Sequence, residues 1–355
     1  MAKVNFKLMV DLNEAKQIIK AVGDQITPII VSEPGVGKTS ILKALEEEMG
    51  DEYDYIYVDC PVKDMMDIAA SIPNHQTKAL EYYVSSLFKL GNGKKKCILL
   101  DEVWKSPKMM QIIYTRLMLE RYVGDEALPE GSIVFGTSNN SSDGVGDSAL
   151  GHILNRVMVL HLCKSTAEQW NEWATKQGIA RPIRAWAAMN TKAFKSYLDP
   201  DQQDNEFIFK PSSTTKSFVS PRSLAKCSPV ILNKDKYSEN AMMAALAGIA
   251  GEPFAKSIAA FISVESSLIR YDTIIKNPTS TPVPDNVSAL VMMLFEAVDS
   301  VSKQDDLNAY MEYVNRIPSS EIQSIFFTMI MRTKPKLGRY NQQINTWAAD
   351  NFGLL

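Results

Sequence analysis

A glycine-containing segment between an apolar run and a helix-forming run is the first candidate for chemistry. Residues 32–39 read S-E-P-G-V-G-K-T and directly follow the apolar run P-I-I-V. Gly35 and Gly37 let the backbone curl so that successive N–H groups point inward, which is the geometry that binds phosphate oxygens. In such a loop Lys38 reaches the β- and γ-phosphates, and the Thr39 hydroxyl holds Mg²⁺. The predicted ligand is ATP with Mg²⁺, and the predicted contact residues are Glu33, Pro34, Gly35, Val36, Gly37, Lys38, Thr39 and Ser40.

Two adjacent acids end another apolar run. Residues 97–102 read C-I-L-L-D-E, and a parallel strand there would deliver Asp101 to the carboxyl edge of a sheet, where ligands bind in open α/β folds. Asp101 is the predicted metal residue together with Thr39, and Glu102 is predicted to polarise the attacking water. Two acids that simply end a core strand are the alternative interpretation. Because the two acids occur together with the glycine-containing segment 32–39, we favour the catalytic interpretation.

A third polar cluster follows a third apolar run. Residues 136–140 read G-T-S-N-N after S-I-V-F. An amide at this point would lie between the γ-phosphate and the water and would orient the nucleophile. Asn139 is the preferred candidate and Asn140 the alternative. An Asx-type turn that ends the strand would use the same residue types.

The elements that must position these residues are short apolar strands alternating with amphipathic helices, a pattern typical of a parallel α/β sheet. The expected strands are 28–32, 55–59, 97–100, 132–137 and 157–162, with helices at 39–49, 77–90 and 107–120. These elements form an expected nucleotide-binding subdomain, 1–165. A helical lid, 166–232, and a helical C-terminal region, 233–355, would follow, with a polar loop at 199–217 and helices at 241–264, 285–301, 306–316 and 319–332.

Composition narrows the class of protein. The chain has 355 residues, 45% of them hydrophobic, and 38 basic against 41 acidic side chains give a net charge of −3. A near-neutral balance argues against a dedicated nucleic-acid binder. The four cysteines form no C-x-x-C pair, which is typical of reduced thiols. We find no secretory signal and no apolar run of about 18 residues, so we expect a cytoplasmic protein that does not enter a membrane.

Together these motifs resemble those of AAA+ ATPases, and more narrowly those of the MoxR-type branch. The resemblance rests on the phosphate loop, D-E at 101–102, T-S-N-N at 137–140, L-N-R-V at 154–157 and S-P-R-S-L at 220–224. The segment 117–131 resembles the hairpin that such proteins insert before the sensor strand. The implied fold is a P-loop AAA+ core with a central parallel sheet flanked by helices, followed by an α-helical lid and a helical C-terminal region.

The resemblance also implies roles for two arginines. Arg156 matches the arginine finger that is donated to a neighbouring subunit's ATP, and Arg222 matches the sensor-2 arginine that acts in cis from the lid. Guanidinium groups suit phosphate oxygens and offset charge that develops in the transition state. An ordinary surface ion pair for Arg156 and a solvated first-turn residue for Arg222 are the alternatives. The chain departs from the family pattern at Ser32, which replaces the first glycine, and after Asp59, where an expected glycine is absent.

The implied function is that of a ring-forming ATPase, a homo-hexameric chaperone that remodels a protein partner, with a von Willebrand A-type domain protein as a possible partner. Two other classes stay open. One is a nucleotide-gated assembly scaffold with little turnover, against which the retained Glu102 argues. The other is a DNA-directed motor or loader, against which the near-neutral charge and the lack of a recognisable DNA-binding module argue.

Overall fold

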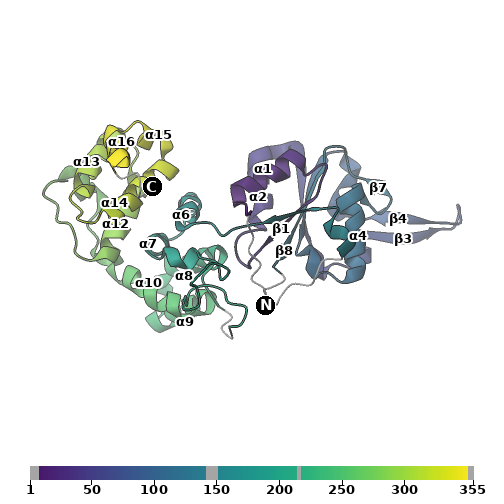
Figure 1. The fold of residues 1–355 in the computed structure, drawn as a ribbon, viewed down its shortest axis with the longest axis horizontal. Coiled ribbons are helices and arrows are strands. Elements are labelled where there is room, and N and C mark those ends of the chain that lie inside the picture. The colour runs from purple at the N-terminus through teal and green to yellow at the C-terminus, as the bar shows by residue number, and fades with distance from the viewer. Residues whose placement is uncertain (1–7, 141–150, 214–216, 351–355) are drawn as a thin grey trace. The chain divides into compact units, whose positions relative to one another are not determined.

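The computed structural model describes residues 8–140, 151–213 and 217–350 of the chain (Figure 1). Contacts between residues divide it into two compact units. Unit 1 comprises Met1–Lys164 together with Lys210–Ser212, and unit 2 comprises Ser165–Phe209 and Ser213–Leu355. The predicted boundary between a lid and a C-terminal region, at 232/233, stays a prediction.

A five-stranded parallel sheet forms the centre of unit 1. Its strands lie in the order β2, β5, β8, β1, β9. Their bounds are Pro28–Ser32 (β1), Tyr53–Asp59 (β2), Lys95–Asp101 (β5), Ile133–Asn139 (β8) and Met158–His161 (β9). Every residue of β1 and β8 is buried, as expected for central strands of a sheet that is covered on both faces. The five predicted strands are confirmed, with ends that differ by at most two residues.

Helices cover both faces of this sheet. One face packs on α1 (Leu12–Val22) and α2 (Ser40–Met49), and the other packs on α4 (Lys108–Glu120). The predictions of α2 and α4 are confirmed. Helix α1 was not predicted, although D-L-N-E in the sequence signals its start: Asp11 caps the helix and Glu14 completes a capping box.

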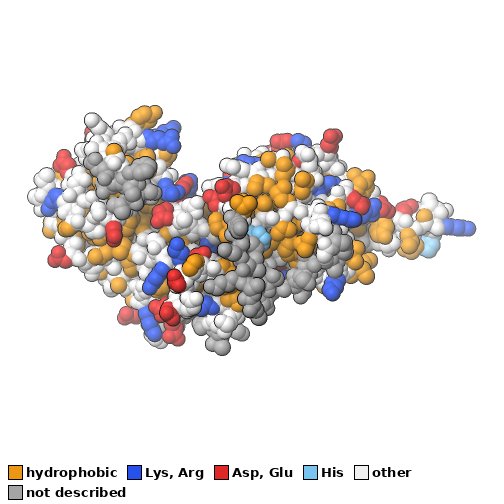
Figure 2. Space-filling view, in the orientation of Figure 1, with side chains coloured by type: hydrophobic (Ala, Val, Ile, Leu, Met, Phe, Trp, Pro, Cys, Tyr) orange, Lys and Arg blue, Asp and Glu red, His pale blue; other side chains and the backbone are white. Residues whose placement is uncertain are grey.

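The predicted helix 77–90 is wrong. This segment contains β4 (Ala79–Val84), which pairs antiparallel with β3 (Ala69–Asn74), and then a short 3₁₀ turn. A short helix, α3 (Met65–Ile68), precedes β3. Aromatic and β-branched residues in Y-Y-V favour a strand, and the Asn74 side chain accepts hydrogen bonds from the two backbone amides that begin the turn. The resulting hairpin projects beyond the sheet and carries exposed apolar side chains along its length (Figure 2).

A second, smaller hairpin follows α4. Its strands are β6 (Tyr122–Val123) and β7 (Glu126–Ala127), within the segment predicted to form one. Gly124 at its turn has φ 57°, and a Cβ there would lie 3.1 Å from the Cβ of Ala69 and 3.3 Å from that of Tyr82. The two hairpins therefore pack directly on each other. A last short helix, α5 (Gly151–Leu154), precedes β9.

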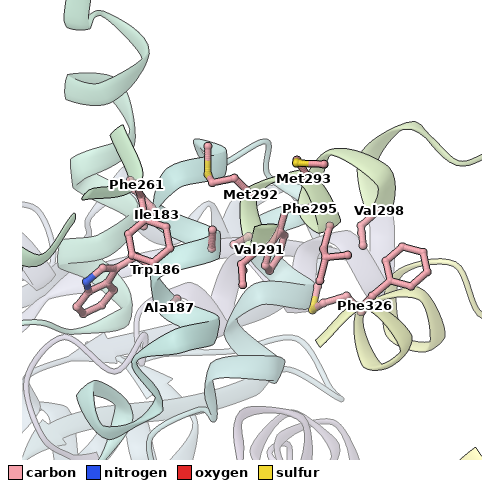
Figure 3. Packing of buried hydrophobic residues seen from close by; sticks show 14 of the residues in the cluster. Ile183, Trp186, Ala187, Phe261, Val291, Met292, Met293, Phe295, Val298 and Phe326 are labelled. Atoms are coloured by element: carbon pink, nitrogen blue, oxygen red, sulfur yellow. The ribbon is translucent and has the colours of Figure 1, made fainter. Parts of the chain in front are cut away.

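In its described residues, unit 2 consists of helices and loops without a strand. Its helices are Ala167–Lys176 (α6), Arg181–Met189 (α7), Pro221–Leu232 (α8), Glu239–Ala250 (α9), Glu252–Val264 (α10), Tyr271–Lys276 (α11), Val287–Ser300 (α12), Gln304–Val314 (α13), Ser320–Thr333 (α14), Pro335–Arg339 (α15) and Gln342–Asp350 (α16). One apolar cluster runs through the unit. Helix α12 contributes its densest part, and side chains from α7, α10 and α14 pack around it (Figure 3).

The predicted helix 241–264 is wrong in one respect, because it is two helices, α9 and α10. Gly251 separates them with φ 94°, and Pro253 follows in the first turn of α10. In the sequence G-E-P, the glycine is a signal for the end of one helix and the proline is a signal for the start of the next. The other predicted C-terminal helices correspond to α12, α13 and α14. Within the described ranges, no helix combines the length and the apolar character needed to cross a bilayer.

Candidate active site

The three polar clusters at 32–39, 101–102 and 136–140 meet at the carboxyl edge of the sheet. Strand β8 lies between β1 and β5. Ser32 at the end of β1 is in register with Asn139 at the end of β8, and β5 ends at Asp101. Because parallel strands end on the same edge, the loop after β1, the amide and the acidic pair share one side of the molecule.

The loop between β1 and α2 has the curled backbone that its glycines permit. Gly35 has φ 81° and Gly37 has φ 107°, values in a region that residues with a side chain rarely adopt. The loop leads directly into α2, which begins at Ser40. The backbone N–H groups and the positive end of the helix dipole at this point form an electropositive site that suits a phosphate group.

Lys38 spans the space between the loop and β8. Its side chain is buried, and its ammonium group donates to the carbonyl oxygens of Ser32 (3.0 Å) and Glu33 (3.1 Å). It also donates to Oδ1 of Asn139, at 2.8 Å. The phosphate loop and the end of β8 are thus joined through one lysine. Asn140 is also buried, but Asn139 is the residue that contacts Lys38.

Asp101 receives hydrogen bonds from three hydroxyl groups. Thr39 donates to Oδ2 at 3.2 Å, Tyr57 donates to the same oxygen at 3.0 Å, and Thr137 donates to Oδ1. A hydroxyl beside a carboxylate is a set of hard oxygen ligands that suits Mg²⁺. Partial burial and the nearby Asp101 carboxylate raise the pKa of Tyr57 above its usual range.

Glu102 has an unusual backbone and a restrained side chain. Its φ of 53° and ψ of 37° place it in the left-handed region, and its N–H donates to Oγ1 of Thr137 at 3.1 Å. One carboxylate oxygen accepts from Nδ2 of Asn139 at 3.2 Å, and the other pairs with Lys105 at 2.6 Å. Glu102 is therefore held between an amide and an ammonium group, on the opposite side of Asn139 from Lys38.

A buried ion pair anchors the start of the phosphate loop. The Glu33 carboxylate lies 3.1 Å from the Lys164 ammonium group, and both side chains are 4% exposed. Lys164 follows β9 and is the last residue of this part of unit 1. The pair ties the loop to the segment where the chain passes into unit 2.

The two arginines belong to other elements of the fold. Arg156 is exposed in the turn between α5 and β9, and β9 starts next to Pro28 at the amino edge of the sheet. It is thus at the opposite edge from Lys38 and Glu102. Arg222 is exposed in the first turn of α8, in unit 2, after the N-cap residue Ser220. Within one chain the structure brings together Lys38, Thr39, Asp101, Glu102 and Asn139.

Three residues at the site were missed. Thr137 lies in the T-S-N-N motif but had no assigned role. Tyr57 is part of the alternation Y-D-Y-I-Y-V-D, which places its side chain on one face of β2 with those of Tyr53 and Tyr55. Lys105 lies three residues after Glu102, a spacing that a 3₁₀ turn brings together. Each had a signal in the sequence, but for Thr137 and Tyr57 only the strand order shows that they contact Asp101.

Comparisons with known proteins give distant structural likenesses. No protein-family model matches the chain, and no curated protein is significantly similar in sequence. Among solved structures, a candidate ATPase of Cytophaga hutchinsonii is 15% identical over 97% of this chain and 90% of its own, with a TM-score of 0.35. NtrX of Brucella abortus in complex with ADP is 14% identical over 96% and 68%, with a TM-score of 0.39. A RuvB variant of Thermotoga maritima is 14% identical over 84% and 85%, with a TM-score of 0.37. At this distance we infer function from the strand order and the site instead.

Proposed function

We propose that this chain is an AAA+ ATPase that binds ATP with Mg²⁺ at the carboxyl edge of its sheet and hydrolyses it to ADP and phosphate. The observation that carries the proposal is the position of Asn139. Its amide contacts Lys38 on one side and Glu102 on the other. A phosphate-binding cation and a candidate base therefore lie on two sides of one polar group, at the end of a strand between their own two strands.

Each residue has a role that its contacts support. The N–H groups of the loop and Lys38 bind the β- and γ-phosphates. Thr39 and Asp101 hold Mg²⁺, which supplies charge neutralisation when it is bound. Glu102 accepts a proton from the water that attacks the γ-phosphorus, and Asn139 orients that water. The bond from the γ-phosphorus to the bridging oxygen breaks, and ADP leaves.

The proposal extends to a ring of the MoxR type, a homo-hexamer that remodels a protein partner. Its support is the location of Arg156, which is exposed at the edge of the sheet opposite its own chain's site. In a head-to-tail ring this edge can face the next subunit's nucleotide. The sensor-2 role of Arg222 belongs to the proposal through the family resemblance alone. A partner with a von Willebrand A-type domain belongs to the proposal through the family resemblance alone.

One observation favours a second candidate, a nucleotide-gated scaffold with little turnover. The ion pair with Lys105 occupies one oxygen of Glu102 in the single chain. If this pair persists in the assembled state, the carboxylate is a poor base and ATP acts mainly as a switch.

Two variants test these functions, and the second of them separates the ATPase from the scaffold. Lys38→Ala should lose ATP affinity, because it removes the buried cation of the loop. Glu102→Gln should keep ATP affinity and lower steady-state phosphate release by about 100-fold or more. Glu126→Gln, an exposed acid on β7, is the matched control. Turnover that is equal in the wild type and in Glu102→Gln would favour the scaffold. A wild type that does not bind ATP would refute both functions.

A further inference from the structure

We propose that Tyr57 is a positioning residue that fixes the Asp101 carboxylate for the Mg²⁺ ion bound with ATP. This inference rests on the proposed function. It assigns a role to a strand, β2, that carries none of the predicted site residues. The tyrosine acts through Asp101, because its hydroxyl donates to Oδ2 of that residue.

Strand register explains how the tyrosine reaches the acid. Strand β2 is paired with β5 so that Tyr57 is opposite Leu99, and Asp59 is opposite Asp101. Side chains two residues apart on a strand share a face, so Leu99 and Asp101 lie on the same face as Tyr57. The long phenol side chain extends along this face toward the carboxyl edge and meets Oδ2 at 3.0 Å.

The three hydroxyls on Asp101 are not equivalent. Thr39 belongs to the phosphate loop, and Thr137 also accepts the N–H of Glu102, so that changing either residue disturbs a second part of the site. The Tyr57 hydroxyl can be removed with the phosphate loop and the Glu102 backbone left intact. Tyr57→Phe removes one oxygen atom and therefore tests this hydrogen bond to Asp101 alone.

Positioning matters here because Mg²⁺ demands nearly ideal octahedral geometry and does not adapt to a misplaced ligand. Two donors on Oδ2 and one on Oδ1 hold the plane of the Asp101 carboxylate in one orientation. Without Tyr57, the carboxylate keeps its charge but gains rotational freedom. Loss of a hydrogen-bonding partner of this kind typically weakens metal affinity by about 10-fold to 100-fold.

The chain offers a matched control on the same strand. Tyr55 lies on the same face of β2, two residues away, and its hydroxyl donates to the carbonyl oxygen of Gly50 at 2.9 Å. Tyr55→Phe removes one phenol oxygen and one hydrogen bond, as Tyr57→Phe does, but at the end of α2 instead of at Asp101. A general loss of strand stability would affect both variants.

The test measures ATP affinity at equilibrium, with and without Mg²⁺, in full-length protein carrying Glu102→Gln so that ATP is not consumed. The ratio of the two dissociation constants is the Mg²⁺ coupling. We expect Tyr57→Phe to lower this coupling by about tenfold and to leave Mg²⁺-free ATP affinity unchanged. We expect Tyr55→Phe to change neither quantity. In the background with Glu102 intact, higher Mg²⁺ concentration should restore the turnover of Tyr57→Phe.

Three results would overturn the inference. They are an unchanged Mg²⁺ coupling in Tyr57→Phe, an equal loss of ATP affinity with and without Mg²⁺, and an equal effect of Tyr55→Phe. These failures leave the proposed function standing, provided that the parent protein binds ATP more tightly with Mg²⁺. A parent protein that shows no ATP binding would instead refute the proposed function, and this inference with it.

Discussion

At the scale of single residues, Glu102 is restrained in both its backbone and its carboxylate. Its backbone is in the left-handed region, and its carboxylate is held by Asn139 and Lys105. Left-handed conformations cost a residue with a side chain about 1 kcal/mol or more, which the bond from its N–H to Thr137 helps to offset. The orientation of the Glu102 carboxylate is thus fixed, but one of its two oxygens is paired with Lys105.

Lys105→Met should raise basal phosphate release. The change frees Oε2 of Glu102, and because a pair at this exposure is worth about 1 kcal/mol or less, we expect a gain of no more than about fivefold. Lys108→Met, at the start of α4, is the control, because the Lys108 side chain is exposed. Steady-state kinetics with ATP as the varied substrate would check the result. A fall in both turnover and ATP affinity would instead make Lys105 a nucleotide ligand.

The Glu33–Lys164 pair should stabilise unit 1 more than a surface pair does. Both side chains are 4% exposed, and removing one charge of a buried pair costs about 3 to 5 kcal/mol. We therefore expect Glu33→Gln to lower the free energy of unfolding by about 3 kcal/mol, measured by denaturant titration. The double variant Glu33→Gln with Lys164→Met should recover more than half of that loss. Additive losses in the double variant would show that the two residues are not coupled.

At the scale of secondary-structure elements, the sequence predicted the parts of the fold that local signals determine. The five strands and the loop before α2 follow from apolar runs, glycines and acids that lie close together in the chain. The hairpin of β3 and β4 was not predicted, because its strands are stabilised by pairing and by contact with Gly124, about forty residues further on. Local motifs identified Lys38, Asp101 and Asn139, but they did not reveal the contact of Tyr57 with Asp101, because that contact depends on strand order.

Gly124→Ala should loosen the base of the β3–β4 hairpin. The new Cβ would lie 3.1 Å from that of Ala69, and φ 57° adds backbone strain of about 1 to 2 kcal/mol. We expect faster hydrogen exchange of backbone amides in residues 69–84. Gly93→Ala is the matched control, because Gly93 has φ 67° but has open space around its Cβ position. Equal exchange in the two variants would mean that strain, and not packing between the hairpins, is responsible.

At the scale of the whole molecule, the proposed ring places each active site between two copies of the chain. Arg156 and Lys38 lie at opposite edges of one sheet, so in the proposed ring a complete site would combine the loop of one subunit with the arginine of the next. The arrangement predicts that two inactive variants can complement each other.

Arg156→Ala and Lys38→Ala should each be inactive alone, and a mixture should regain activity. Arg156→Ala keeps a complete phosphate loop, and Lys38→Ala keeps the arginine, so about a quarter of the interfaces in a random one-to-one mixture would be complete. Loss of an arginine finger typically costs a thousandfold or more in turnover, which makes the recovery easy to detect in phosphate release. A mixture as inactive as its components would place Arg156 in cis or in a structural role.

The most direct measurement is an experimental structure of the Glu102→Gln variant with ATP and Mg²⁺. Our account predicts the γ-phosphate within hydrogen-bonding distance of Lys38 and Asn139, the metal between Thr39 and Asp101, and the arginine at position 156 of a neighbouring copy facing the same phosphate. A nucleotide bound elsewhere on the chain, or one bound at this edge with Lys38 still directed to Asn139 and away from the phosphates, would contradict it.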